Sequence, residues 1–178
     1  MLTKSVHNQL ENAMKDILKQ ALVHAQELGA NYADVRFSQL ETESISVKNC
    51  AVLGVDSHVD WGIGIRVLYE GAWGFASNPD LEDPERMLKT VQRAIELAKA
   101  SAKVNNNIVE LVDKPSVIDQ WSSLFQIDPF EIDLEQKLKL LIDCNRAMSE
   151  VEGVRITKGS MDFMRENRLY MDTEGSVI

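Results

Sequence analysis

Cysteine is scarce in this sequence of 178 residues, where only Cys50 and Cys144 occur, far apart and without C-x-x-C spacing. Two isolated thiols favour a reducing compartment over a disulfide framework. Long apolar runs are also missing, since no segment approaches the roughly 20 apolar residues that a membrane-spanning helix needs. No secretory signal is visible after Met1. We therefore expect a cytoplasmic protein with no membrane partner.

Positive charge is in deficit as well. The chain has 19 lysines and arginines against 28 aspartates and glutamates, a formal net charge of −9. Nucleic-acid affinity comes largely from basic side chains that displace counterions from phosphates. The densest basic segment, residues 86–103, mixes both signs along a predicted helix. These observations predict no nucleic-acid partner.

Histidine is too sparse for a recognisable metal site. His7, His24 and His58 share no ligand spacing, and neither an HExxH pair nor a GxSxG nucleophile turn is present. Asp56 and Asp60 flank His58 at intervals of two, so all three side chains share one face if this segment is a strand. They form either a metal or general-base cluster or a solvent-facing surface, and we favour the surface. We predict no catalytic residue, no metal ligand and no cofactor in this chain.

The first 104 residues show a helix, a series of strands and a second helix. Apolar residues recur every three or four positions from Asn8 to Leu28, and Gly29 follows as a typical helix end. Asp83 before Pro84 is a typical N-cap for the second helix. Between the helices the apolar period is two, over residues 33–38, 45–48, 52–59, 63–69 and 72–77. We predict an α+β domain over residues 1–104, in which two helices flank an antiparallel meander of about five strands.

Beyond this domain the patterns are weaker. Residues 105–129 are predicted to be a linker, and residues 130–178 the truncated beginning of a second α+β domain. That second domain is expected to open with a helix capped by Asp133 and a hairpin that turns near Glu166-Asn167. Residues 173–175 indicate a further turn, and residues 176–178 the start of another strand. A sheet cut at this point leads us to expect a fragment, or the start of a longer protein.

The segment "GIGIRVLYEGAWGFASNPD", residues 62–80, combines glycines with aromatic residues. Its bare G-x-G lacks the third glycine and following helix of a dinucleotide site, so strand glycines are favoured. A turn is expected at Glu70-Gly71. Trp73 and Phe75 must share one strand face, which is either core beneath the helices, the favoured interpretation, or an exposed peptide groove. In the second case Arg66, Trp73 and Phe75 are the candidate groove or interface residues.

Taken together, "GANYADVRFSQLETESISVKN", "GIGIRVLYEGAWGFASNPDL", "RAIELAKA", "DPFEIDLEQKLKLLIDCNRAM" and "LYMDTEGSVI" resemble the N-terminal region of the TldD/PmbA family, also named modulators of DNA gyrase. The resemblance is closer to the TldD branch. It implies an intracellular zinc peptidase that encloses flexible peptides and acts as a dimer, either TldD with TldE or a homodimer. The family's HExxxH motif lies downstream of this region and is absent here, so no catalytic residue can be transferred.

Three functions remain open at this point. The chain is the substrate-enclosing and assembly region of a TldD-type metallopeptidase, inactive by itself, or it belongs to a PmbA/TldE-like non-catalytic partner subunit. The third alternative is a stand-alone domain that binds peptides or proteins through a sheet edge.

Overall fold

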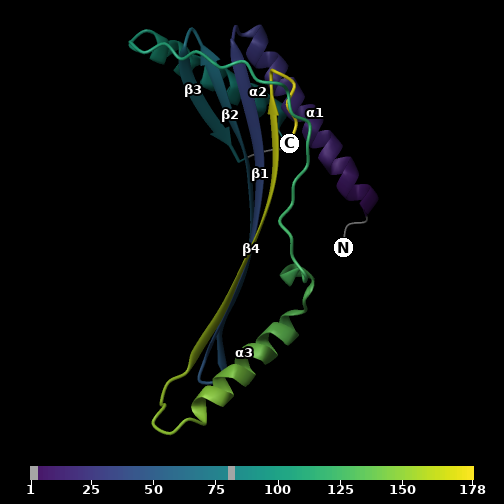
Figure 1. The fold of residues 1–178 in the computed structure, drawn as a ribbon, viewed down its shortest axis with the longest axis vertical. Coiled ribbons are helices and arrows are strands. Elements are labelled where there is room, and N and C mark those ends of the chain that lie inside the picture. The colour runs from purple at the N-terminus through teal and green to yellow at the C-terminus, as the bar shows by residue number, and fades with distance from the viewer. Residues whose placement is uncertain (1–3, 80–82) are drawn as a thin grey trace. The chain divides into compact units, whose positions relative to one another are not determined.

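A computed structural model describes residues 4–79 and 83–178, and the side chains of these residues apart from residues 4–11 and Pro84. The helices are α1 (Lys4–Glu27), α2 (Pro84–Ala102), the short 3₁₀ helix η1 (Pro129–Glu131) and α3 (Leu134–Ser149). The strands are β1 (Tyr32–Lys48), β2 (Ala51–Tyr69), β3 (Ala72–Asn78) and β4 (Lys158–Asp172), in the sheet order β3-β2-β1-β4. The described residues thus form an α+β fold with an antiparallel four-stranded sheet (Figure 1).

Two compact units divide the chain, and three of the strands contribute to both. Unit 1 contains Met1–Ser38, Trp61–Trp121 and Arg168–Ile178, and unit 2 contains Gln39–Asp60 and Ser122–Asn167. The sequence-based division at residues 104 and 129 stays a prediction. No described helix is long and apolar enough to cross a membrane.

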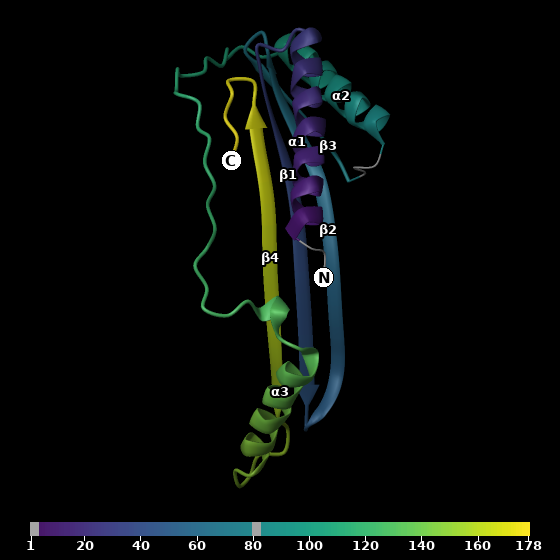
Figure 2. The same ribbon diagram turned by 90° about the vertical axis from the view of Figure 1, so that its right-hand side faces the viewer.

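Unit 1 has the predicted arrangement of two helices over one face of a sheet. Helices α1 and α2 cover this face of the strands, as Figure 2 shows. The apolar positions of β1 and β2 alternate as expected for strands with one buried side. Their shared core consists of Leu18, Ala21, Leu22, Ala25, Ala33, Val35, Ile63, Ile65, Val67, Met87, Val91, Ala94, Ile95, Ala98, Leu169 and Met171.

The end of α1 and the start of α2 lie where the sequence predicts them. Gly29 has a φ of +95° just after α1, which is the left-handed conformation expected of a residue that ends a helix. Asp83 caps α2, because its Oδ1 accepts hydrogen bonds from the backbone N–H groups of Glu85 at 2.9 Å and Arg86 at 3.4 Å. Both predicted helices of the first domain are therefore confirmed, with α1 beginning a turn earlier than its apolar pattern.

The prediction of five short strands is wrong. The first two expected strands are one continuous strand, β1, and the next two are β2. No glycine or proline interrupts residues 38–44, where we expected the first break, and Asp60 and Trp61 continue β2 without a bend. Polar residues at these positions lie on a strand surface instead of forming turns, because a sheet tolerates polar side chains wherever its faces meet solvent.

Two tight turns join the first three strands. Asn49 and Cys50, with φ of 49° and 61°, connect β1 to β2, and Glu70 and Gly71, with φ of 46° and 74°, connect β2 to β3. Two consecutive residues with positive φ are typical of type I′ hairpin turns, whose twist matches that of the flanking strands. The predicted turn at Glu70-Gly71 is confirmed, and the turn at Asn49-Cys50 lies in the gap between the expected strands 45–48 and 52–59.

The second glycine of "GAWGF" allows α2 to approach β3. A Cβ atom added to Gly74 would collide with the carbonyl oxygen of Ala94 and lie 2.5 Å from the backbone nitrogen of Ala98. Both groups belong to the helix backbone, which cannot move aside as a flexible side chain could. Gly74 is therefore required by packing, as a strand glycine often is where another backbone approaches.

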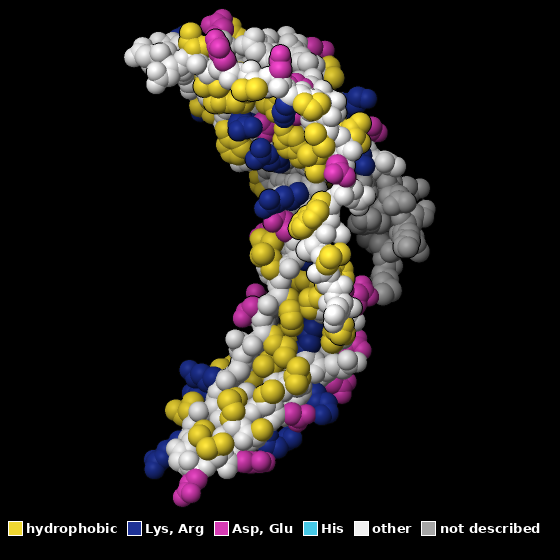
Figure 3. Space-filling model, in the orientation of Figure 1, with side chains coloured by type: hydrophobic (Ala, Val, Ile, Leu, Met, Phe, Trp, Pro, Cys, Tyr) yellow, Lys and Arg dark blue, Asp and Glu magenta, His cyan; other side chains and the backbone are white. Residues whose placement is uncertain are grey.

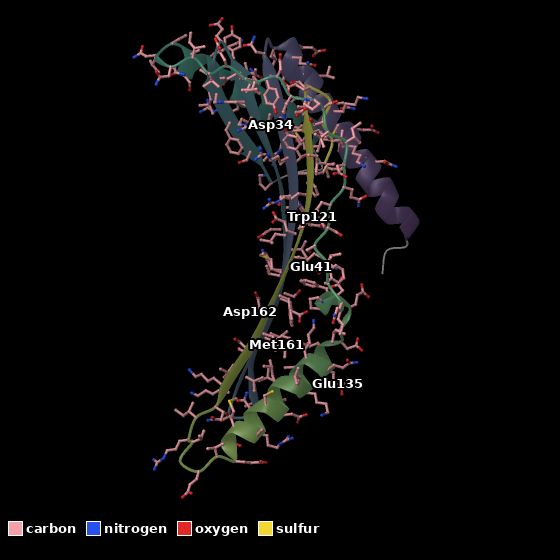
Figure 4. The ribbon with its side chains drawn as sticks, in the orientation of Figure 1. Asp34, Glu41, Trp121, Glu135, Met161 and Asp162 are labelled. Carbon is pink, nitrogen blue, oxygen red and sulfur yellow. The ribbon has the colours of Figure 1, made fainter. Side chains whose placement is uncertain are left out.

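Unit 2 packs α3 against its own stretch of the sheet. Its small core contains Ile45, Val47 and Leu141. Beside this core, the Lys137 ammonium donates to Glu43 at 2.7 Å, and both side chains are largely buried. The lower ribbon of Figure 4 shows α3, with Glu135 near its start, beside the strand that carries Met161 and Asp162. Asp133 stands at the N-cap of α3, but its side chain makes no cap hydrogen bond.

The predicted hairpin at the end of the chain is also wrong. Residues 158–172 form the single strand β4, with Glu166 and Asn167 inside it, and β4 joins the same sheet beside β1. Strand β4, which we expected in a second domain, thus belongs to the same sheet as β1 to β3. The predicted turn at residues 173–175 is confirmed, with Gly175 at a φ of +95°, and Tyr170 and Ile178 exchange backbone hydrogen bonds of 2.8 and 3.0 Å.

Candidate functional site

The face of the unit 1 sheet opposite the helices carries a group of aromatic and charged side chains. Alternation along each strand sends Tyr32, Asp34 and Arg66 to this face, while their neighbours Ala33, Val35 and Val67 enter the core. Lysine and arginine side chains lie among hydrophobic ones over these strands in Figure 3. We call this surface the open face.

Arg66 on β2 is held between a carboxylate and an aromatic ring. Its Nη2 lies 2.7 Å and its Nε 2.8 Å from Oδ2 of Asp34, which is only 2% exposed. The guanidinium carbon lies 4.4 Å from the ring centroid of Trp73, a distance typical of a cation–π contact. Trp73 in turn meets Tyr32 edge-on, with centroids 5.9 Å apart. The four side chains fix one another's orientation (Asp34 is labelled in Figure 4).

A series of hydrogen-bonded polar side chains extends from β1 to the end of β4. The hydroxyls of Tyr32 and Tyr170 lie 2.9 Å apart, and the Tyr170 hydroxyl donates to Oδ2 of Asp172 at 3.0 Å. The ammonium of Lys114 donates to the same oxygen at 3.3 Å. Oδ1 of Asp172 accepts from the backbone N–H groups of Glu174 and Ser176 at 3.0 and 2.9 Å. This carboxylate thus connects the C-terminal turn to the aromatic side chains.

Residues 109–118, which follow α2, cross over this face, and we call them the covering segment. They are fixed at two points. At one end, Val109 N–H donates to the carbonyl of Gly71 at 2.9 Å. At the other end, Val177 N–H donates to the carbonyl of Val117 at 2.8 Å, and Ile118 forms a parallel bridge with Val177. Between these points Val112 is 86% exposed, and it also lines the space in front of the sheet. This covering segment therefore forms a wall in front of the sheet.

A cavity of about 250 Å³ lies between the covering segment and the open face. All of its residues belong to unit 1. It combines two phenol hydroxyls, an indole, a guanidinium and an ammonium with an apolar wall. Its lining comprises Tyr32, Arg66, Trp73, Leu111, Val112, Lys114, Tyr170 and Glu174. Ligand sites commonly combine aromatic and apolar walls with convergent polar groups, and this small lining has both kinds of group.

Burial and hydrogen bonds set the charge states in this cavity. Burial would raise the pKa of Asp172, but hydrogen bonds from Ser176, Tyr170 and Lys114 outweigh it and hold the pKa below its ordinary value. Burial, together with hydrogen bonds to Tyr32 and Asp172, raises the pKa of Tyr170 far above that of a free phenol. Behind the cavity Asp172 is therefore a carboxylate at neutral pH, and the lining presents two neutral phenol hydroxyls with Lys114 and Arg66 positively charged.

Two of the three predicted interface residues come together in this cavity. Arg66 and Trp73 line it, whereas Phe75 lies outside the lining, directly across from Arg66 in the β2–β3 register. Phe75 is 58% exposed, and its ring lies over Gly64, where an added Cβ would be 3.0 Å from the ring. The favoured interpretation of Trp73 and Phe75 as core beneath the helices is therefore wrong. Ala72 and Gly74 face the helices instead, because the narrow gap to α2 admits only small side chains.

The polar strand around His58 faces solvent, as we favoured from the sequence. The His58 imidazole Nε2 lies 3.1 Å from a carboxylate oxygen of Asp60, and both side chains are more than half exposed. Within the described residues, no group of three histidine, cysteine, aspartate or glutamate side chains could hold a metal ion. The side chain of His7 lies outside the described residues.

Sequence reasoning missed Tyr32, Tyr170, Asp172 and Lys114. Along its strand, each tyrosine alternates with buried apolar residues. This pattern places both tyrosines on the face opposite the core. Lys114 lies in a segment without periodicity, and no local pattern could have shown that it meets Asp172, 58 residues later. Only the paired strands β1 and β4 bring these residues together.

The fold and this site define an α+β domain with a cavity on the face of its sheet opposite the helices. Residues 33–98 match the family model described as PmbA/TldA metallopeptidase domain 1. This part of the chain is therefore similar to the first domain of PmbA/TldA metallopeptidases.

Curated proteins of the same kind are similar over a longer part of the chain. A metalloprotease of Methanocaldococcus jannaschii is 28% identical over 148 residues, which are 83% of this chain and 32% of that protein. A metalloprotease TldD homolog of Haemophilus influenzae is 26% identical over 150 residues, again 83% of this chain and 30% of that protein. The chain thus spans about a third of the length of the curated relatives that it matches.

Solved structures share the fold at low sequence identity. The crystal structure of TldE from Thermococcus kodakarensis has a TM-score of 0.67 and 14% identity, covering 91% of this chain and 36% of that one. A candidate modulator of DNA gyrase from Bacteroides thetaiotaomicron has a TM-score of 0.74 and 13% identity, covering 92% of this chain and 37% of that one. These likenesses concern the fold alone.

Proposed function

We propose that this chain is the non-catalytic N-terminal region of a TldD-type, metal-dependent peptidase, and that it helps to enclose flexible peptide substrates. Zinc in a part of the protein outside this chain would activate water and polarise the scissile carbonyl. The residues described here would bind and orient the peptide. A partner subunit, either TldE-like or a second copy, would complete the enclosure, and the protein would act in the cytoplasm.

The cavity on the open face is the observation that carries this proposal. Trp73 and the two tyrosines offer ring surfaces and hydroxyls to a peptide, and rigid aromatic side chains of this kind supply contact area at a low entropic cost. Arg66 and Lys114 add donors for peptide carbonyls and carboxylates. Because Asp34 and the Trp73 ring already hold Arg66, little ordering entropy is lost when a ligand binds.

Peptide binding by the isolated chain tests this proposal. We would titrate the 178-residue chain with a fluorescently labelled, unstructured peptide of about 20 residues and measure anisotropy. Trp73→Ala should weaken binding about tenfold or more, because aromatic residues that anchor an interface commonly contribute this much. The matched control is Trp121→Ala. Trp121 also belongs to unit 1 and is 81% exposed, but it lies outside the cavity lining.

In the full-length protein, the same substitution separates binding from chemistry. Trp73→Ala should raise KM for an unstructured peptide and leave kcat within about twofold, since a residue that binds the ground state and the transition state equally affects KM alone. Equal binding by wild-type protein and the Trp73→Ala variant would contradict the proposal. So would a large fall in kcat at unchanged KM.

A TldE-like partner subunit is the second candidate, favoured by the fold shared with the solved TldE structure. It makes a different prediction for the rest of the protein. A TldD-type chain should continue into an HExxxH motif and retain stoichiometric zinc after purification, whereas a TldE-like chain should bind peptide and a catalytic partner without retaining zinc. Metal analysis of the full-length protein, with and without its partner, distinguishes the two.

A further inference from the structure

Part of β2 is an unpaired sheet edge in the described structure. Strand β3 pairs with β2 only from Ile63 to Tyr69, and β1 is the strand on the other side. Residues 51–62 of β2 therefore have no described strand along their outer side, as Figure 2 shows where β2 continues past the end of β3. An edge of this length presents a row of free backbone N–H and C=O groups that another strand can pair with.

This edge lacks the usual protection against pairing. Exposed edges are commonly guarded by lysine or proline, and residues 51–62 contain neither. Three of its apolar side chains are well exposed, with exposed fractions of 63% for Leu53, 43% for Val55 and 41% for Val59. The edge does carry charged or titratable side chains, Asp56, His58 and Asp60. Whether these oppose or favour a partner depends on what stands across from them.

We propose that this edge pairs antiparallel with the same edge of a second copy, about a two-fold axis at Ser57. In this register Asp56 of each copy stands opposite His58 of the other, so two carboxylate–imidazole pairs form across the axis. Asp60 stands opposite Gly54, which has no side chain to oppose it. A two-fold contact of this kind uses one self-complementary patch on both copies.

The other face of the paired strands is apolar in the same register. Val55 stands opposite Val59 of the second copy, and Leu53 opposite Trp61, with the Ser57 side chains meeting at the axis. Residues directly opposite in an antiparallel pair point to the same face, and every pair in this register joins two odd or two even positions. The alternation of β2 is therefore preserved across the contact, with one apolar and one charged face.

Neighbouring registers are disfavoured by like charges. A two-fold axis at Asp56 would place the two Asp56 carboxylates opposite each other. An axis at His58 would place Asp56 opposite Asp60. Like charges directly opposite each other destabilise a sheet, so these two centres are disfavoured. Axes at Val55 and Val59 oppose no like charges, but they pair only residues 51–59 and 56–62, because β3 already occupies β2 from Ile63 onward. The axis at Ser57 pairs residues 52–62, the longest stretch of this edge, and its self-complementary order favours a second copy over an unrelated strand.

A cysteine at the axis tests the register directly. In a background of Cys50→Ser and Cys144→Ser, we would introduce Ser57→Cys and oxidise the chain at a concentration where sedimentation shows dimers. Opposite residues in antiparallel strands have Cα atoms about 4.5–5.5 Å apart, which fits a disulfide. We expect most of the protein to run as a covalent dimer on a non-reducing gel.

Asp60→Cys in the same background is the matched control. Its two copies would lie six residues apart along the paired strands, roughly 20 Å at 3.4 Å per residue, too far for a disulfide. Equal cross-linking at positions 57 and 60 would overturn the proposal. A chain that stays monomeric by sedimentation up to about 200 μM, well above the micromolar dissociation constant of a modest specific interface, would also overturn it.

A charge exchange tests the proposed pairs without cysteine. Asp56→Lys places a cation opposite His58 in both pairs, and we expect the dimer dissociation constant to rise by roughly tenfold. Adding His58→Asp restores opposite charges with their positions reversed and should recover most of the affinity. Because both positions are exposed on a strand, folding should be retained, which circular dichroism would check. No recovery in the double variant would contradict the register.

This inference deepens the partner part of the proposed function, but its readout is separate from peptide binding. Trp73→Ala should leave the Ser57→Cys cross-link intact, and Asp56→Lys should leave peptide affinity of the isolated chain unchanged. A chain that binds peptide but forms no cross-link would overturn only the edge pairing. A cross-linked dimer that binds no peptide would overturn only the proposed site.

Discussion

Asp172 shows how a single buried side chain joins several parts of unit 1. Its carboxylate accepts hydrogen bonds from the C-terminal turn, from Tyr170 and from Lys114 of the covering segment. A buried charge is tolerated only when it is paired in this way, and removing its charge leaves several donors without their partner. The carboxylate thereby holds the covering segment in place in front of the cavity.

Acid should weaken this arrangement in a predictable direction. The pKa of Asp172 is lower in the folded than in the unfolded chain, so its contribution is complete above about pH 4 and is lost as pH falls through the folded-state value. Asp172→Asn should therefore lower the free energy of unfolding at pH 7 by about 2 kcal/mol. It should also make stability less dependent on pH between 4 and 2. Urea titrations at several pH values measure both effects, and an unchanged acid slope would contradict this role.

Gly74 provides a second test at the residue scale. An added methyl group would collide with the backbone of α2 at Ala94, and a packed helix can move away only at a cost. Gly74→Ala should lower the free energy of unfolding by about 2–3 kcal/mol. Gly153→Ala is a useful comparison, because nothing lies within 4 Å of its added Cβ and only its φ of +87° opposes the change. Urea denaturation should show the larger loss at Gly74.

At the scale of elements, the long strands β1 and β2 are the main departure from the predicted fold. Period-two patterns identified most of their residues, but polar stretches inside them were interpreted as turns. Turn residues marked Glu70-Gly71 directly, whereas the turn at Asn49-Cys50 followed only from the gap between two expected strands. A turn with both φ angles positive costs little at asparagine or glycine and more at cysteine, so Cys50 gives no local signal.

The same turn yields a prediction for the β1–β2 hairpin. Cys50→Gly should raise the free energy of unfolding by about 1 kcal/mol, because glycine adopts a φ of 61° without the steric cost that other residues meet. Cys144→Gly is the matched control. Cys144 lies inside α3, where glycine should lower stability by about 1 kcal/mol. Thermal unfolding of the two variants should shift in opposite directions, and a loss of stability at position 50 would contradict this account.

At the scale of the whole chain, two units of unequal size share three strands. Unit 1 has a large core beneath two helices, whereas the core of unit 2 rests on three fully packed side chains. Stability need not be uniform in such a protein, since regions with few buried apolar contacts open more easily. We therefore expect the proposed cavity in unit 1 to persist when unit 2 is weakened.

Leu141→Ala tests this independence. Leu141 is 5% exposed in the core of unit 2, and its truncation should cost about 2–4 kcal/mol locally. Hydrogen exchange followed by mass spectrometry should show faster exchange in α3 and in residues 158–164, with the amides of α2 unaffected. Faster exchange throughout the chain would instead indicate one cooperative fold. Peptide affinity at the cavity should stay within about twofold of wild type.

The sequence by itself determined the helices of unit 1, their caps, the alternation of the strands and the two sheet faces, because these depend on neighbours within a few residues. It also carried the resemblance to the TldD/PmbA family. The tertiary structure decided which face of β3 is buried, because the distance from Gly74 to α2 is set by packing across the core. It also decided that Lys114, Tyr32 and Asp172 meet, since that contact depends on β4 pairing with β1 more than a hundred residues earlier in the chain.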